Sequence, residues 1–455
     1  AAAERPHGRR GDPRDPVVRR HAEVPRPRRQ AVEELQRRPV RHRRPRRRPE
    51  LRALRPLRHR QGARPQGTYI LDSSVLVDPD DPAKGVDWLA QPKLDVTANT
   101  TVTLDARKAR PVDITVPAKG AKSEFAAASY TVGQGDRAYG FGWFLQTYAN
   151  FRTAHLGPAV TDGSLSQQWD GHWSAGGKEQ YDTTVVNRVK RLATGYSRHY
   201  KAGELATVKV GMGASARGKK GVVSAAGWLP DSFGTSSVGL PQPIPGTRTL
   251  HLSTQGGVKW GLDFEQDGGV DQDGFPLADA YYTLGAPQTF KAGTSYEKVF
   301  NTAVFGPHLN ADYGIFRDGD DLYGFVPLFA DGDQHAGSST FTKVTTTLYR
   351  NGAKVGSNDD PLFGGKAFRV PAGDAAYRLT TSVSRSTKVA DASTRIDASW
   401  TFRSRKPSGA GVASCPPPPS ASTPPPAWTA ASPPASRSAC RSRWRARHAA
   451  PTSSP

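Results

Sequence analysis

A Gly-Thr-Ser triplet at residues 234–236 raises the question of a catalytic serine. A serine becomes a nucleophile when a histidine takes its proton and a carboxylate orients that histidine. The triplet continues as Ser237-Val238-Gly239, without the Met-Ala step that would start a nucleophile helix. No His-Gly-Thr-His or Asp-Thr/Ser-Gly motif precedes it to supply the base and the carboxylate. We therefore expect Ser236 to lie in an ordinary Gly/Ser loop, and we expect no catalytic residue in this chain.

Three acidic clusters alternate carboxylates with glycines, in DGGVDQDG, RDGDD and ADGDQ. Such loops can bind Ca²⁺, which prefers several hard oxygen ligands. None of the three has the glutamate that an EF-hand carries at its twelfth position, and Asp-Gly is also an ordinary choice for a hairpin turn. We expect plain turns and no cofactor. Calcium is the alternative, with the candidate ligands Asp267, Asp271, Asp273, Asp318, Asp320, Asp331 and Asp333.

Other residues that could do chemistry form weaker patterns. Glu265 beside Asp263 and Asp267 is the best local carboxylate pair, but a glycosidase pair must lie roughly 5–10 Å apart in space. Aromatic residues gather at 140–151 and 167–173, where they could stack on sugar rings; we expect them to anchor the core instead. The central histidines lack the spacing of a metal site. They are His155, His172, His199, His251, His308 and His335.

The elements that must position these residues are strands. Short runs rich in Val, Ile and Thr, separated by Pro and Gly, read GTYILDSSVLV, TTVTLDA and PVDITVP. No window of the central chain holds a sustained 3.6-residue apolar repeat of helical length. We expect an all-β protein, with a small β segment at 67–118 and a β-rich domain at 119–306.

The stretch 307–407 has the clearest strand pattern. Asn351-Gly352 is a strong signal for a two-residue hairpin loop and would pair Leu348 with Val355. The runs YRLTTSVS (377–384) and RIDASWTF (395–402) alternate apolar and polar residues, as half-buried antiparallel strands do. In the second run the inward-facing residues would be Ile396, Ala398, Trp400 and Phe402. This pattern predicts a β-sandwich, and the whole centre would form two to three sandwich-like domains.

The two ends carry almost all of the net charge of +22, because residues 1–66 contribute +15 and residues 413–455 contribute +5. All lysines lie in the centre. Segments of Arg, Pro, Ala and Ser without Lys are typical of GC-rich DNA translated out of frame; the alternative is a genuine Arg-rich interaction tail. Apolar residues there are too sparse to offset chain entropy. We expect residues 1–66 and 408–455 to be disordered.

Few features of the chain bear on its compartment. Both cysteines, Cys415 and Cys440, lie in the C-terminal tail, so the centre has no disulfide and no cysteine metal site. The chain contains no apolar run of transmembrane length, and we expect no signal peptide within it. The first residue is Ala and the only methionine is Met212. We expect the chain to be a piece of a longer product.

Three segments together resemble a known family. They are RPQGTYILDSSV (64–75), LDARKARPVDITVP (104–117) and YRLTTSVSRSTKVADASTRIDASWTFRS (377–404). They are similar to the region that follows the catalytic domain in large secreted actinobacterial subtilisin-like serine peptidases, and the likeness covers about residues 67–412. The resemblance implies an accessory β-rich extension whose catalytic triad lies upstream, so it transfers no catalytic residue to this chain.

These observations lead to one functional expectation and two alternatives. We expect a non-catalytic, extracellular accessory region that stabilises the parent peptidase, spaces it from the surface or holds a protein substrate. Its partner would be the parent's catalytic domain or that substrate. The first alternative is a carbohydrate- or cell-wall-binding module that uses the aromatic segments. The second is nucleic-acid binding through the Arg-rich N-terminus, which the nearly neutral centre disfavours.

Overall fold

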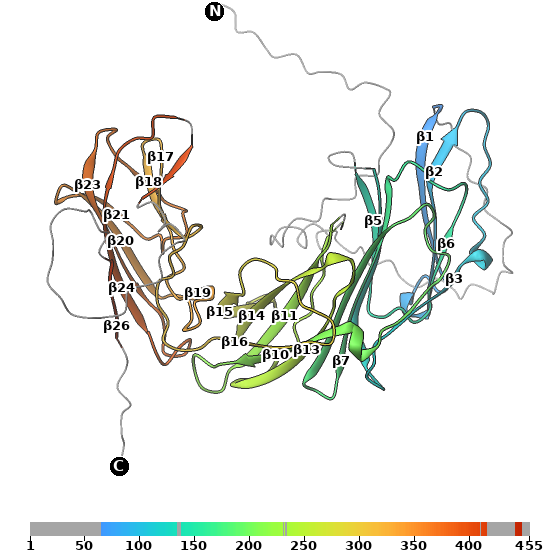
Figure 1. Cartoon of the computed structure of the whole chain (residues 1–455), viewed down its shortest axis with the longest axis horizontal. Coiled ribbons are helices and arrows are strands. Elements are labelled where there is room, and N and C mark those ends of the chain that lie inside the picture. Colours follow the sequence, from blue (N-terminus) through green and yellow to red (C-terminus); the bar gives the residue numbers. More distant parts are fainter. Residues whose placement is uncertain are drawn as a thin grey trace, which may run out of the picture.

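The computed structural model describes residues 65–133, 138–230, 232, 234–409, 411–415 and the backbone of 442–447. The described chain is all-β, with only short 3-10 turns between its strands, and this confirms the predicted fold class. Its sheets follow one another along a curved arrangement (Figure 1). No helix among these residues is long and apolar enough to span a membrane. The expected disorder of 1–64 and of most of 408–455 falls outside the described residues. Within the tail the expectation is wrong at Val412–Ser414 and Ser442–Arg447, because both segments pair with strands of the centre.

Two sheets form the N-terminal sandwich. The first has the order β1 (Gly67–Leu76), β2 (Val86–Val96), β6 (Phe151–His155), β3 (Arg110–Thr115) and β9 (Tyr196–His199). The second has the order β16 (Ser295–Phe300), β10 (Leu205–Met212), β13 (Gly246–Ser253), β8 (Glu179–Arg188), β7 (Leu165–Ala175), β4 (Lys122–Val132) and β5 (Tyr139–Leu145). Their facing side chains share one buried core, in which the rings of Trp88 and Tyr130 lie 5.3 Å apart.

A third sheet packs on the opposite face of the second. Its order is β12 (Gln242–Pro243), β11 (Lys220–Trp228), β14 (Lys259–Val270), β15 (Pro276–Thr283) and β19 (Ala336–Ser339). Buried apolar residues of β10 and β13 meet those of β11 and β14 there, and the same core continues into the C-terminal sheets. The second sheet therefore serves two cores, one on each face.

Two further sheets complete the chain. One has the order β22 (Phe368–Arg369), β18 (Asp321–Phe325), β17 (Gly314–Asp318) and β25 (Val412–Ser414). The other has the order β21 (Ala353–Asn358), β20 (Lys343–Arg350), β23 (Ala375–Ser384), β24 (Arg395–Ser404) and β26 (Ser442–Arg447). The predicted alternation is confirmed, because β24 buries Ile396, Ala398, Trp400 and Phe402.

The predicted hairpin at Asn351-Gly352 forms, but its predicted register is wrong. Both loop residues have positive φ, 47° and 85°, as a primed turn requires. Arg350 then pairs with Ala353, but a bulge beyond Tyr349 shifts the ladder so that Leu348 lies opposite Gly356. Val355 is the extra residue and is 39% exposed. A bulge of this kind changes the register by one residue, which the hydrophobic pattern alone does not reveal.

Candidate functional site

A band of polar side chains is buried on the face of the second sheet that meets the third sheet. On that face, Leu250 and Leu252 of β13 lie opposite Gln180 and Asp182 of β8, and Asp182 lies opposite His172 of β7. The face therefore changes from apolar to polar within two strands. Side chains point to alternate faces along a strand, so Gln168, Asp170 and Thr184 join the same band. All of its side chains are buried.

Ser236, His172 and Asp182 form a hydrogen-bonded chain within this band. The Nδ1 atom of His172 lies 2.7 Å from Oδ1 of Asp182, and its Nε2 atom lies 2.8 Å from Oγ of Ser236. His172 is 1% exposed and Asp182 is 0% exposed, whereas Ser236 is half-buried. The distances and the order of groups are those of a serine nucleophile with its base and orienting carboxylate.

Ser236 belongs to residues 234–241, which lie between β11 and β12 in the chain. We call these residues the crossing segment because they lie over the polar band of β7 and β8. The side-chain amide of Gln168 donates to the carbonyl of Gly234, 2.9 Å away, and that of Gln180 donates to the carbonyl of Val238, 3.0 Å away. Nη2 of Arg248 donates to the carbonyl of Leu240 over 3.2 Å. The segment lacks apolar periodicity, so bonds to its main chain hold it in place.

A second carboxylate, Asp170, makes the band strongly polar. It accepts the hydroxyl of Thr184 at 2.5 Å and the amide of Gln168 at 3.0 and 2.8 Å. Burial raises the pKa of Asp170, while these bonds, the charge of His172 and a bond from Ser236 act in the opposite direction. Burial also lowers the pKa of Arg248, against the attraction of Asp182.

The expectation that Ser236 lies in a loop outside any regular strand agrees with the structure, but the loop is not an isolated one. No local sequence motif contains His172 and Asp182, because they come from two paired strands. A usable signal was present. Gly176 and Gly177 form the turn between β7 and β8, so Ala175 pairs with Glu179, and counting outward in register places residue 172 opposite residue 182.

The acidic clusters form turns in which the carboxylates accept nearby amides. Oδ1 of Asp271 accepts the N–H groups of Asp273 and Phe275, both at 2.9 Å. Oδ1 of Asp267 accepts the N–H of Gly269 at 2.7 Å. Asp318 ends β17 at the turn into β18. Among the described residues no three potential metal ligands come together, and calcium binding remains a prediction without a located site.

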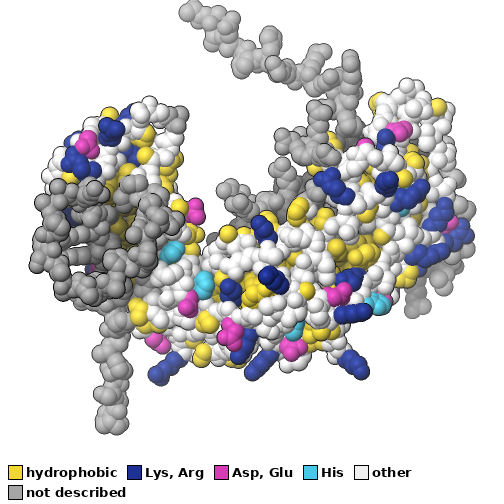
Figure 2. All heavy atoms as spheres, in the orientation of Figure 1, with side chains coloured by type: hydrophobic (Ala, Val, Ile, Leu, Met, Phe, Trp, Pro, Cys, Tyr) yellow, Lys and Arg dark blue, Asp and Glu magenta, His cyan; other side chains and the backbone are white. Residues whose placement is uncertain are grey.

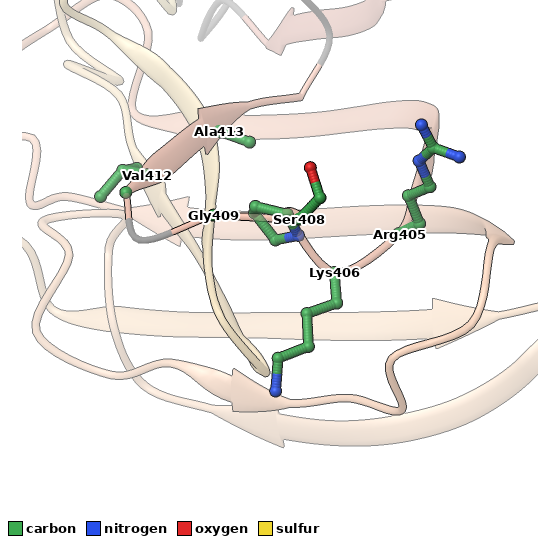
Figure 3. A pocket seen from close by; sticks show the side chains of 8 residues that line it. Arg405, Lys406, Ser408, Gly409, Val412 and Ala413 are labelled. Carbon is green, nitrogen blue, oxygen red and sulfur yellow. The ribbon is translucent and has the colours of Figure 1, made fainter.

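Two more candidate calcium ligands form bonds with neighbouring protein groups. Asp331 accepts the amides of Asp333 and His335 through Oδ1 and contacts Nδ1 of His335 at 3.0 Å through Oδ2. Asp320 forms an ion pair with Lys406 at 3.2 Å. Lys406 also borders a shallow hollow of about 400 Å³, formed by residues 405–409 and 411–413, in which the two basic side chains point in different directions (Figure 3).

Two remaining candidates have clear positions. Asp263 and Glu265 lie on one face of β14, and burial together with the charge of Asp263 raises the pKa of Glu265. The aromatic segments are mostly core, as expected: Trp169 is 2% exposed and Trp173 is 6% exposed. Phe144 of β5 is the exception, at 72% exposed.

The six central histidines remain dispersed among different elements. His199 also lies near a serine and an aspartate, but its single Nε2 atom contacts both Ser197 and Asp113 and the ring is exposed. His172 is buried and uses its two ring nitrogens for the two partners. Comparison of the sequence with models of known protein families finds no match, and comparison with characterised proteins finds none either.

Proposed function

We propose that this chain is an accessory region of an extracellular subtilisin-like peptidase, that it does not itself cleave proteins, and that it holds an extended protein segment. The proposal is based mainly on the edge strand β5. Its sequence, Tyr-Gly-Phe-Gly-Trp-Phe-Leu, has no charge and no proline. It pairs with β4 on one side, and no described strand pairs with its other side. Natural edge strands usually carry charge, proline or a bulge that blocks further pairing.

An extended polypeptide can add to such an edge as a further strand. Main-chain hydrogen bonds would supply affinity, and alternate side chains would supply selectivity. Phe144 presents a large apolar side chain beside this edge, and Tyr139 is also exposed. Hydrophobic side chains gather on the surface over the part of the molecule that contains β5 (Figure 2). These features suit a protein partner with apolar residues.

The burial of the other aromatic rings favours a protein ligand over a sugar. A sugar-binding face needs several exposed rings in a row, and Trp169 and Trp173 lie in the core instead. The resemblance of residues 67–412 to the post-catalytic region of secreted subtilisin-like peptidases supports both the accessory role and the extracellular location.

Casein, an extended protein substrate, provides the test. The full chain should bind fluorescent casein without cleaving it. Phe144→Lys should weaken binding by about thirtyfold, because losing a central interface contact costs about 2 kcal/mol or more. The matched control is Val270→Lys, since Val270 is also exposed but lies at the end of the interior strand β14.

Three results would count against the proposal. They are absence of casein binding, equal weakening in both variants, and binding of insoluble cell-wall polysaccharide that casein does not compete away. The last result would favour the carbohydrate-binding alternative. The alternative that relies on the Arg-rich residues 1–66 concerns a segment outside the described residues.

A further inference from the structure

We propose that Ser236 is a nucleophilic serine that small carboxylic esters acylate, with His172 as its general base and Asp182 as the residue that positions His172. This activity goes beyond the holding of a protein segment and uses different residues. It rests on the hydrogen-bonded chain of Ser236, His172 and Asp182, at 2.8 and 2.7 Å.

The surroundings of Asp182 determine how His172 is oriented. The amide of Gln180 donates to both carboxylate oxygens of Asp182, each at 3.1 Å, and so holds the carboxylate in place. An aspartate beside Nδ1 selects the tautomer with hydrogen on that atom. Nε2 of His172 is then the acceptor for the Ser236 hydroxyl, as a general base must be.

Asp170 lies two residues from His172 on the same face of β7 and would stabilise the charge that forms. Its oxygens are already engaged by Thr184 and by the amide of Gln168. The charge of His172 lowers the pKa of Asp170, so the two groups attract each other electrostatically. A second buried carboxylate near the imidazole favours the imidazolium that appears when His172 takes the proton.

Access to Ser236 restricts the substrate to small molecules. His172 is buried, whereas Ser236 is half-buried and its neighbours Thr235 and Ser237 are exposed. The crossing segment lies over the polar band and leaves Ser236 half-buried, which favours small molecules over a folded polypeptide.

Acylation balances without any additional reactant. The proton of the Ser236 hydroxyl moves to Nε2 of His172 while Oγ bonds to the carbonyl carbon of the ester. The bond from that carbon to the leaving alkoxide then breaks, and the alkoxide takes the proton from Nε2. The products are O-acylated Ser236, an alcohol and a neutral histidine.

A fluorophosphonate probe tests the site, because Oγ of an activated serine bonds to phosphorus and displaces fluoride. The full chain should incorporate one probe molecule, and tandem mass spectrometry should place it on Ser236. Ser236→Ala should abolish labelling, and Ser237→Ala should retain it. His172→Gln should slow labelling by about 100-fold or more, as expected for loss of a general base.

The variant Asp182→Asn tests whether Asp182 positions His172 or only stabilises the fold. The maximal labelling rate should fall by about 100-fold, while the probe concentration for half-maximal rate stays unchanged and far-UV circular dichroism shows that the variant is folded. Absence of label on Ser236 in the folded wild-type chain overturns the proposal, and this result does not depend on any variant folding. Label on Ser236 that forms equally fast in the His172 and Asp182 variants overturns the assigned roles.

Discussion

Trp400 should be the main anchor of the last sheet, and its removal gives a sharp test of the register of β24. Trp400 is 3% exposed, and Leu379, which is 0% exposed, lies opposite it on β23. Thr401, the next residue, is exposed. The perturbation is therefore the pair of variants Trp400→Ala and Thr401→Ala, which truncate adjacent side chains on opposite faces of one strand.

The magnitude follows from burial. Truncating a buried Trp to Ala costs about 3–5 kcal/mol, because transfer energy is lost and a cavity remains. The core that contains Trp400 extends over residues 206–415. For a unit of about 200 residues, each kcal/mol shifts the melting temperature by about 2–4 °C, so Trp400→Ala should lower it by about 6–20 °C. An exposed substitution should change stability by no more than about 0.5 kcal/mol.

Differential scanning calorimetry of the full chain, with far-UV circular dichroism to confirm β structure, measures both shifts. Equal shifts in the two variants would refute the register, because a slip of one residue exchanges the buried and exposed faces of a strand. A large shift in Thr401→Ala alone would refute it as well.

Three further predictions concern other parts of the fold. Burial raises the pKa of Asp170, so its carboxylate costs no stability below the unfolded pKa of about 3.9, and the cost develops as the pH rises through the folded pKa. The variant Asp170→Asn should therefore raise the melting temperature more at pH 7 than at pH 4. A gain that is independent of pH would contradict this prediction. Gly171→Ala places a Cβ 2.1 Å from the ring of buried Trp173 and should cost about 1–3 kcal/mol in chemical denaturation, whereas Gly203→Ala, with open space around it, should cost less. Chelation by EGTA should leave the melting temperature unchanged, because the Asp271 carboxylate already accepts two amides of its own turn; a decrease would support the calcium alternative.

Local sequence pattern was sufficient for much of the strand architecture. Alternation in residues 395–402 correctly predicted the buried face of β24, because a half-buried strand repeats every two residues. The turn at Asn351-Gly352 was also predicted, since few residue pairs adopt positive φ at both positions. The bulge at Val355 was not, because it depends on how the neighbouring strand packs.

The sequence by itself determined that this is an all-β protein, because its apolar residues alternate over short runs bounded by Gly and Pro. Only the tertiary structure decided that Ser236 meets His172 and Asp182. Ser236 lies 64 positions from His172 along the chain, and the two come together because the crossing segment lies over the face of β7. Strand periodicity specifies the face on which a side chain lies, but the packing of sheets and segments determines what it contacts. The candidate site was therefore invisible to motif spacing, and it depends on the hydrogen bonds that Gln168 and Gln180 donate to the crossing segment.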